Sequence, residues 1–282
     1  MSTNANGSEP QNLMRKHKVV SQKEWIAARK ALLKKEKEAT RVSDELAAER
    51  RELPWVKVGK NYVFDAPGGR VALADLFAGR SQLVIYHFMF GPDWQEGCPS
   101  CSFVSDHFDG ALSHLAARDV TLAVVSRAPL EKIEVFQKRM GWDFEWVSSH
   151  GGDFNSDFHV AFTKEELAQG KVNYNYEMQE FPSAEAPGLS VFIKDANGDV
   201  FHTYSTYGRG LELLMSTYRI LDMVPKGRDE DHLGFPMEWV RYHDRYDTNA
   251  FADADKPYWP ETGAAATGSS SSCGCGSKEA GV

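Results

Sequence analysis

Two cysteines three positions apart, Cys98 and Cys101, are the residues of this sequence best placed to do chemistry. They stand in the stretch GPDWQEGCPSCSF, which directly follows the unbroken apolar run LVIYHFMF. A pair with C-x-x-C spacing is a redox centre, half of a zinc site or two buried thiols. The elements around the pair help to decide among these three.

The pair lies at a predicted junction between a strand and a helix. The apolar run before it is typical of a strand buried on both faces of a parallel sheet. SFVSDHFDGALSHLAARD after it predicts a helix, despite Gly110. Unpaired N–H groups and the positive end of the helix dipole favour a thiolate there. Pro99 suits the helix start because its missing N–H would have had no partner.

This position predicts different roles for the two sulfurs. We expect the more exposed Cys98 to attack a target disulfide, and the deeper Cys101 to resolve the mixed disulfide that forms. The chemistry requires no cofactor. Its redox partner would be another dithiol or disulfide protein, or glutathione.

The remaining elements predict an α/β fold. VTLAVVS, LEKIEVFQKRMGW and DFEWVSS continue the strand and helix alternation that is typical of right-handed parallel units. PGLSVFIKDANGDVFHTYSTYG then predicts two antiparallel strands joined at Asn197-Gly198. GLELLMSTYRILDMVP predicts one closing amphipathic helix that ends before Pro225.

This order of elements resembles the thioredoxin-like fold. In such folds a proline, usually cis, ends the loop that faces the dithiol, and Pro187 stands directly before the predicted hairpin. The resemblance implies a three-layer sandwich with a mixed central sheet, here with a long N-terminal helical arm. It also implies that Pro187 shapes the substrate groove.

Specific motifs resemble one family within this superfamily. EWIAARKALLKKEKEATRVSDELAAERRELPWV, GPDWQEGCPSCSF, HTYSTYGRG and YRILDMVPKGRDE look like the thioredoxin-like family catalogued as domain of unknown function 899. The resemblance covers about residues 20–250. Members are described as predicted dithiol-disulfide oxidoreductases, so it implies that activity here.

The site departs from its better-known relatives. Thioredoxin carries Trp before its first cysteine and Gly-Pro between the pair, whereas Gly97 and Pro-Ser stand here, so the direction of electron flow is not fixed by the motif. Peroxiredoxins carry Thr or Ser three residues before the peroxidatic cysteine, where this sequence has Gln95. A peroxidase is the weaker enzymatic alternative.

His87 is a further candidate, on the strand that leads to the dithiol. Thioredoxin has a buried acidic residue at the similar point, and a His beside the resolving thiol could accept its proton. The alternative is a core histidine that is satisfied by hydrogen bonds.

Composition limits the classes of partner. The 282-residue chain has a net charge of −8, 42% hydrophobic and 26% charged residues, which is ordinary for a soluble protein. An acidic body repels phosphate, so nucleic acid is not expected as a partner. No run is long and apolar enough for a signal or membrane span, which predicts a cytoplasmic protein without membrane contact.

The chain divides into four predicted parts. They are a disordered tail (1–20), a helical arm (21–52), a thioredoxin-like domain (53–250) and a low-complexity tail (251–282). In the arm, Ser21 and Glu24 have capping-box spacing, and Trp25, Leu32, Ala39 and Leu46 recur every seven residues. This narrow apolar stripe packs across the main domain or pairs two copies in a homodimer.

A zinc site would need two further ligands. Cys273 and Cys275 in the tail, or His107 and His114 on the predicted helix, are the available candidates. Zinc sites of this kind usually show two compact knuckles, so no metal is expected, and we interpret the tail pair as uninvolved.

The non-enzymatic alternative is a binding module whose dithiol is incidental. Its recognition surface would contain Trp94, Trp142, Trp146, Trp239 and Trp259, although tryptophans are more often packed in a core. Arg209 and Arg228 could bind an anionic group, although ion pairs explain them better. A binding module predicts an ordinary pKa for Cys98, and an oxidoreductase predicts a lowered one.

Overall fold

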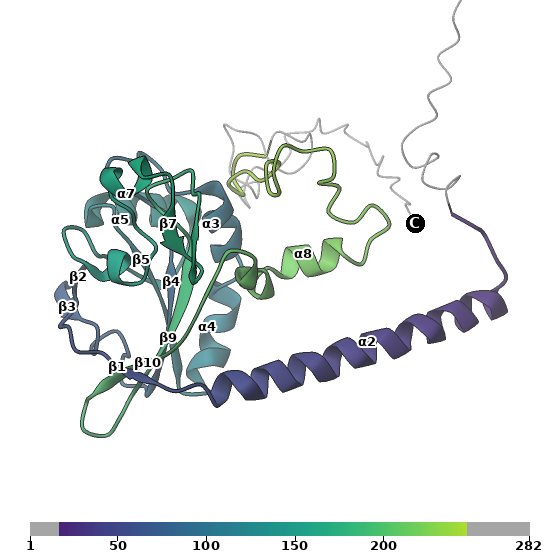
Figure 1. Ribbon diagram of the computed structural model, residues 1–282, viewed down its shortest axis with the longest axis horizontal. Helices are drawn as coiled ribbons and strands as arrows, with labels where there is room; N and C mark the ends of the chain where they lie inside the picture. Colours follow the sequence, from purple (N-terminus) through teal and green to yellow (C-terminus); the bar gives the residue numbers. More distant parts are fainter. Residues whose placement is uncertain (1–16, 247–282) are drawn as a thin grey trace, which may run out of the picture. The chain divides into compact units, whose positions relative to one another are not determined.

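A mixed eight-stranded sheet organises the computed structural model, which describes residues 17–246 (Figure 1). Its strands are β1 (Val56–Lys57), β2 (Val63–Ala66), β3 (Gly69–Ala72), β4 (Gln82–His87), β5 (Val120–Ser126), β6 (Glu145–Ser148), β9 (Gly188–Lys194) and β10 (Val200–Tyr207). They are ordered β1-β10-β9-β4-β5-β6-β2-β3. β7 (Val172–Tyr174) and β8 (Glu177–Gln179) form a separate antiparallel pair.

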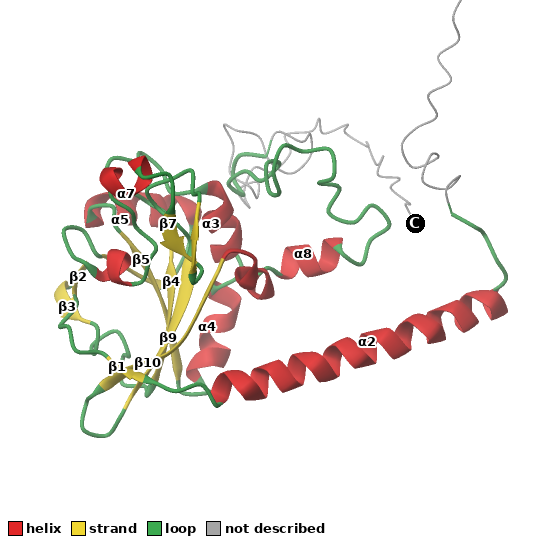
Figure 2. Cartoon of the chain, in the orientation of Figure 1, coloured by secondary structure: helices red, strands yellow, loops and turns green. Residues whose placement is uncertain are grey.

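Helices lie between, before and after these strands in the chain (Figure 2). They are α2 (Gln22–Arg51), α3 (Pro99–Ser105), α4 (Asp109–Ala116), α5 (Leu130–Met140), α6 (Phe154–Asp157), α7 (Lys164–Ala168), the 3₁₀ helix η1 (Gly208–Leu214) and α8 (Ser216–Leu221). β4, β5 and β6 are parallel, and β9 pairs antiparallel with β4 and β10. The predicted α/β fold with a mixed central sheet and an N-terminal helix is therefore confirmed.

Side chains of β4 alternate between two cores on the two faces of the sheet. Leu83 and Ile85 are fully buried in a cluster with the rings of Phe64, Phe77 and Phe192. Tyr86 and Phe88 face the other way, where their rings meet Phe108 and Trp146. Both faces are apolar, which explains the unbroken apolar run in the sequence.

The predicted hairpin between β9 and β10 forms as expected. Gly198 has φ +88°, a left-handed conformation that glycine adopts without steric cost. The Asp195 carboxylate accepts the N–H groups of Asn197 and Asp199, each at 2.9 Å, and so closes the turn.

Two predicted helices are each broken in the structure. The helix expected over 102–119 is split into α3 and α4 by a turn at 106–108. The closing helix is split into η1 and α8, because Met215 leaves helical geometry with φ −102° and ψ 86° and buries its side chain. The second break lies near the dithiol, because Met215 lines the same cavity as Cys98 and Cys101.

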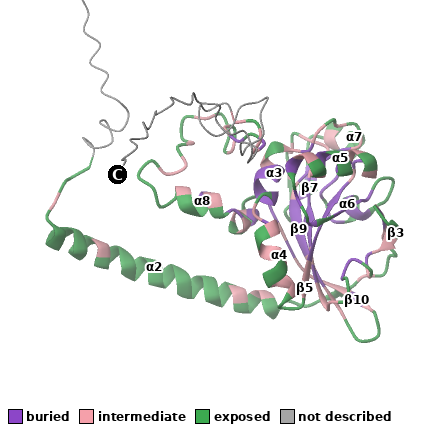
Figure 3. Cartoon of the chain, turned by 180° about the vertical axis from the view of Figure 1, so that it is seen from behind, coloured by how far each residue is buried: buried purple, intermediate pink, exposed green. Residues whose placement is uncertain are grey.

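The N-terminal helix α2 is as long as predicted and begins with the expected capping box of Ser21 and Glu24. None of its residues is buried (Figure 3). Trp25, Leu32 and Leu46 are about half exposed. Packing of this stripe across the main domain and pairing with a second copy both stay predictions.

The other parts predicted from the sequence are covered incompletely. Residues up to 240 form one unit of contacts, and a second begins at Arg241. Most of the predicted tail 1–20 and all of 251–282, with Cys273, Cys275 and Trp259, lie outside the described residues. Within residues 17–246, no helix is both long and apolar enough to cross a membrane.

We predict that Ser126→Ala destabilises the protein. Ser126 is fully buried, donates to the Phe88 carbonyl at 2.8 Å and accepts the Trp146 indole N–H at 3.0 Å. Alanine leaves that indole N–H unpaired in the core, so the free energy of unfolding should fall by about 1–3 kcal/mol. Denaturant unfolding followed by tryptophan fluorescence measures this change. Ser43→Ala on the exposed face of α2 is the control, and equal effects of the two changes would contradict the prediction.

Candidate active site

Cys98 is the N-cap residue of α3, and Pro99 occupies the first helical position, as the sequence predicts. The Cys98 N–H donates to the Met89 carbonyl at 2.9 Å, which fixes the start of α3 against the end of β4. Gly97 is required before it, since a Cβ there would lie 2.5 Å from the Phe88 ring. This contact explains why no large residue precedes the first cysteine.

The Cys98 thiol is partly exposed and activated. Its pKa is lowered to about 7, first by a hydrogen bond from the Cys101 thiol. The N–H groups of Cys101 and Ser100 and the Ser100 hydroxyl add to this effect, while burial opposes it. A large fraction of Cys98 is therefore thiolate near neutral pH, and the thiolate is the nucleophilic form.

Cys101 differs from Cys98 both in its exposure and in the direction of its pKa shift. Its side chain is 2% exposed, and burial, followed by its bond to Cys98, raises its pKa well above the ordinary value. The Met89 N–H donates to its sulfur at 3.5 Å. Cys101 is therefore a protonated thiol held directly behind a thiolate.

Tyr86 is the buried polar neighbour of the pair. It is 0% exposed and lines the same cavity as the two cysteines. Burial, and then proximity to the Cys101 thiol, raises its own pKa well above the ordinary value, while its hydroxyl favours the Cys101 thiolate. Sequence reasoning missed Tyr86, although its position next to His87 on the same strand was visible.

His87 is not beside the resolving thiol, so its predicted position is wrong. Its ring centroid lies 5.5 Å from that of Phe154 and 5.7 Å from that of Phe158, and its Nε2 is 2.8 Å from the Ser190 hydroxyl. Adjacent side chains of a strand point to opposite faces, and Tyr86 occupies the face of the dithiol. Burial lowers the pKa of His87 to about 3, which makes it a poor proton acceptor. His87 is therefore a core histidine, but it is only partly satisfied, because its buried Nδ1 has no hydrogen-bond partner among the described residues.

Pro187 does meet the two cysteines, on the wall of the same cavity. No cis peptide bond occurs among residues 17–246, so the bond before Pro187 is trans. The Tyr174 hydroxyl donates to the Pro187 carbonyl at 2.7 Å and accepts the Gly208 N–H at 3.0 Å. Tyr174 thereby joins the proline loop to the start of η1.

A buried ion pair stands two residues before this proline. Glu185 contacts Arg127 at 3.2 Å with its side chain 3% exposed, and burial raises its pKa to about 7 although Arg127 opposes the shift. The sequence contained no periodic pattern that would have found it.

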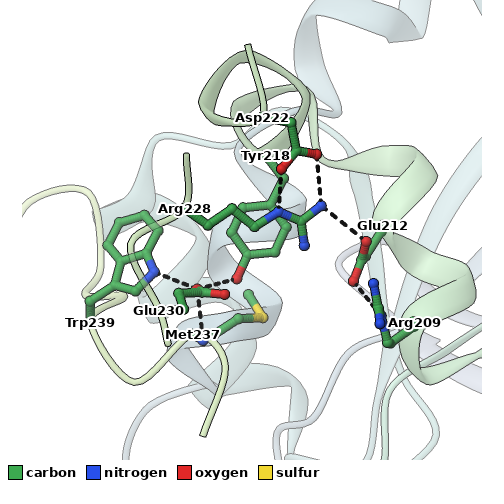
Figure 4. A network of polar contacts seen from close by, with 8 residues as sticks. All are labelled: Arg209, Glu212, Tyr218, Asp222, Arg228, Glu230, Met237 and Trp239. Atoms are coloured by element: carbon green, nitrogen blue, oxygen red, sulfur yellow. Dashed lines mark hydrogen bonds and ion pairs between the residues drawn. The ribbon is translucent and has the colours of Figure 1, made fainter. Parts of the chain in front are cut away.

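The cavity beside the dithiol has a volume of about 480 Å³. Its walls come from β4 and α3, from Pro187, and from η1, α8 and residues 228–237. Figure 4 shows the polar network in the last of these walls, where Arg228 lies between Asp222 and Glu212.

The predicted arginines line this cavity, and both are paired. Arg209 contacts Glu212 at 2.8 Å. Arg228 contacts Asp222 at 2.8 Å and Glu212 at 3.1 Å. The ion-pair interpretation is confirmed for these two residues.

Other candidate residues are placed elsewhere. Trp142 and Trp146 are buried in the core, so they form no recognition surface. His107 contacts Thr217 and the Val104 carbonyl through its two ring nitrogens. Gln95 is exposed and does not line the cavity. Within residues 17–246, no group of three potential metal ligands comes together.

Cys98 and Cys101 thus lie at the start of α3, after a central strand of a mixed sheet, and Pro187 lines the same cavity. Residues 14–246 match the model of the family described as "Bacterial protein of unknown function (DUF899)". The chain belongs to this family. No curated protein matches the sequence.

Three solved structures that are similar to this chain are named as a peroxiredoxin, a peroxidoxin and a thiol:disulfide interchange protein. Peroxiredoxin Q from Xanthomonas campestris is 13% identical, with 60% of this chain and 98% of that chain covered and a TM-score of 0.39. Peroxidoxin BcpB from Mycobacterium tuberculosis is 15% identical, with 58% of this chain and 97% of that chain covered and a TM-score of 0.37. A putative thiol:disulfide interchange protein DsbE from Chlorobium tepidum is 13% identical, with 58% of this chain and 97% of that chain covered and a TM-score of 0.36.

The hydrogen bond between the thiols predicts how alkylation of Cys98 depends on pH. In reduced protein with Cys273 and Cys275 changed to Ser, the rate of reaction with iodoacetamide should have its midpoint near pH 7, against about 8.5 for a free thiol. Cys101→Ala removes the donor, so the midpoint should rise. Cys101→Ser keeps a hydroxyl donor, so the midpoint should rise less. One common midpoint for all three proteins would show that Cys101 does not activate Cys98.

Proposed function

We propose that this protein catalyses thiol-disulfide exchange with Cys98 as attacking and Cys101 as resolving thiol. The observation that carries the proposal is the asymmetry of the pair. A partly exposed thiol of lowered pKa faces the cavity, and a buried thiol of raised pKa lies directly behind it. A pair of buried structural thiols would show no such difference.

The exchange proceeds in two steps in the direction of disulfide reduction. The Cys98 thiolate attacks one sulfur of a disulfide R–S–S–R, forms a mixed disulfide and releases the other half as a thiolate, which takes up a proton. Cys101 then loses its proton and attacks the Cys98 sulfur, which releases the second thiol. The substrate gains two electrons, and the Cys98–Cys101 pair becomes a disulfide.

Neighbouring groups assist both steps. Donors to the Cys98 sulfur stabilise it as the attacking thiolate of the first step. The Met89 N–H and the Tyr86 hydroxyl favour the Cys101 thiolate that must form in the second step. Pro187 borders the space in which the substrate sulfur would lie.

The proposal retains the partners and the compartment expected from the sequence. A dithiol protein, or two molecules of glutathione, would reduce the Cys98–Cys101 disulfide in the next cycle. A reducing compartment such as the cytoplasm would keep the pair available as thiols.

We predict that Cys101→Ser traps the intermediate. In proteins with Cys273 and Cys275 changed to Ser, the loss of the resolving thiol means that reaction with 2-hydroxyethyl disulfide should leave one mercaptoethanol unit on Cys98 that dithiothreitol removes. Wild type should instead form the internal disulfide, and Cys98→Ser should form neither product. Intact-mass spectrometry distinguishes these species.

The same measurement separates the alternatives. Absence of any adduct on Cys101→Ser would refute the two-thiol mechanism and favour the binding module. Oxidation of the wild-type pair by hydrogen peroxide, but not by the disulfide, would favour the peroxidase.

We predict that changing Cys273 and Cys275 together to Ser leaves turnover intact. The proposed mechanism is complete within α3 and needs no third thiol. Steady-state reduction of 2-hydroxyethyl disulfide by dithiothreitol measures turnover, and a fall of more than about tenfold would give the tail cysteines a role in the cycle.

A further inference from the structure

Residues far along the chain close one side of the cavity beside Cys98. The segment 228–237 contributes Arg228, Glu230, Asp231, Pro236 and Met237 to the cavity lining. A pair of thiols on an open surface would accept any disulfide that reaches it. This wall restricts what can approach Cys98, so its structure bears on the substrate.

Hydrogen bonds of Glu230 hold the wall of residues 228–237 against α8. Its Oε1 accepts three hydrogen bonds, from the Tyr218 hydroxyl at 2.7 Å, the Trp239 indole N–H at 2.6 Å and the Met237 N–H at 3.0 Å (Figure 4). Burial raises the pKa of Glu230, but these donors outweigh it and lower the pKa overall. The ionised carboxylate therefore holds both ends of the segment 230–239.

Ring contacts add a second attachment. The Arg228 guanidinium lies over the Tyr218 ring at 4.0 Å from its centroid. Phe103 of the dithiol helix α3 contacts the rings of Tyr218 at 5.5 Å and Trp239 at 5.8 Å. The wall is thus built on the same helix that carries the two cysteines.

The size and lining of the cavity fit a small molecule. Its volume of about 480 Å³ lies within the roughly 300–1,000 Å³ of typical small-molecule sites. The side chains of Met89, Val104, Leu211, Met215, Pro236 and Met237 make most of the lining apolar. We expect a site of this size and lining to favour a small disulfide over one held in a folded protein.

The charges of the lining disfavour anions. Among the described lining residues, two guanidiniums, of Arg209 and Arg228, stand against the three carboxylates of Glu212, Glu230 and Asp231, which leaves a net charge of −1. Both guanidiniums are already bonded to carboxylates. An anionic substrate would therefore meet a net repulsion.

We infer that the cavity takes a low-molecular-weight, largely apolar disulfide that is neutral or cationic. This inference rests on the proposed exchange, and it narrows the expected partners by disfavouring glutathione disulfide and protein disulfides as substrates of Cys98. In the reaction, the reduced Cys98–Cys101 pair gives two electrons and two protons to R–S–S–R and yields two R–SH and the internal disulfide.

Three disulfides of similar size test the charge preference. Cystamine is dicationic, 2-hydroxyethyl disulfide is neutral and 3,3′-dithiodipropionate is dianionic. Reduced protein with Cys273 and Cys275 changed to Ser is mixed with each, and formation of the internal disulfide is followed by acid quench and mass spectrometry. Each rate is divided by that of the same disulfide with free 2-mercaptoethanol, which removes differences in intrinsic reactivity. We expect the dianion to react about tenfold more slowly than the other two.

Variants of the wall separate charge from enclosure. Asp231→Asn should raise the normalised rate of the dianionic disulfide relative to the rates of the other two. Glu230→Ala removes the acceptor of three hydrogen bonds. The rate with insulin disulfides should therefore rise relative to the rate with 2-hydroxyethyl disulfide. Glu230→Gln keeps an acceptor oxygen and should leave insulin disfavoured. Circular dichroism checks that each variant is folded.

The outcomes distinguish this inference from the proposed function. Slow dianion and insulin reactions in wild type, relieved by the respective variants, support it. Equal normalised rates for all three small probes, a faster dianion, or insulin as the best substrate would overturn it while leaving exchange by Cys98 and Cys101 in place. Failure of every probe to oxidise the pair, together with no adduct on Cys101→Ser, would overturn both.

Discussion

The hydrogen bond from the Cys101 thiol to the Cys98 sulfur is the interaction on which the chemistry of this protein depends. It is the largest cause of the lowered pKa of Cys98, and it contributes to the raised pKa of Cys101. The bond requires the two sulfurs to meet across the first turn of α3. That geometry requires Gly97, because a larger residue would collide with Phe88, and it requires the backbone bond from Cys98 to Met89.

The sequence was sufficient to predict the main elements of this site. C-x-x-C spacing after an apolar run, with Pro99 between the cysteines, indicated the strand-to-helix junction, and the structure places Cys98, Cys101 and Pro187 on one cavity. The error at His87 has a simple physical cause. β4 is buried on both faces, so its apolar run contains no polar alternation that shows which face each side chain takes. The face that Tyr86 takes follows from the packing of Phe88 and Phe108 around its ring, which the sequence pattern does not reveal.

The cavity wall was not predictable for a different reason. Residues 222–240 contain no helical or strand period, and their structure depends on individual long-range contacts such as those of Glu230 and Trp239. The same dependence explains why the predicted closing helix is broken. Helical propensity favoured one continuous helix over GLELLMSTYRILDMVP, but burial of Met215 in the cavity lining prevailed over it.

The way in which Cys98 is activated also bears on what this wall can do. The groups that lower its pKa are the thiol of Cys101, two N–H groups and the Ser100 hydroxyl, all within the first turn of α3, and no cationic side chain is among them. Arg209 and Arg228 line the same cavity, but carboxylates bind both. In the proposed exchange, the wall would therefore select substrates by size and charge without supplying the groups that activate Cys98.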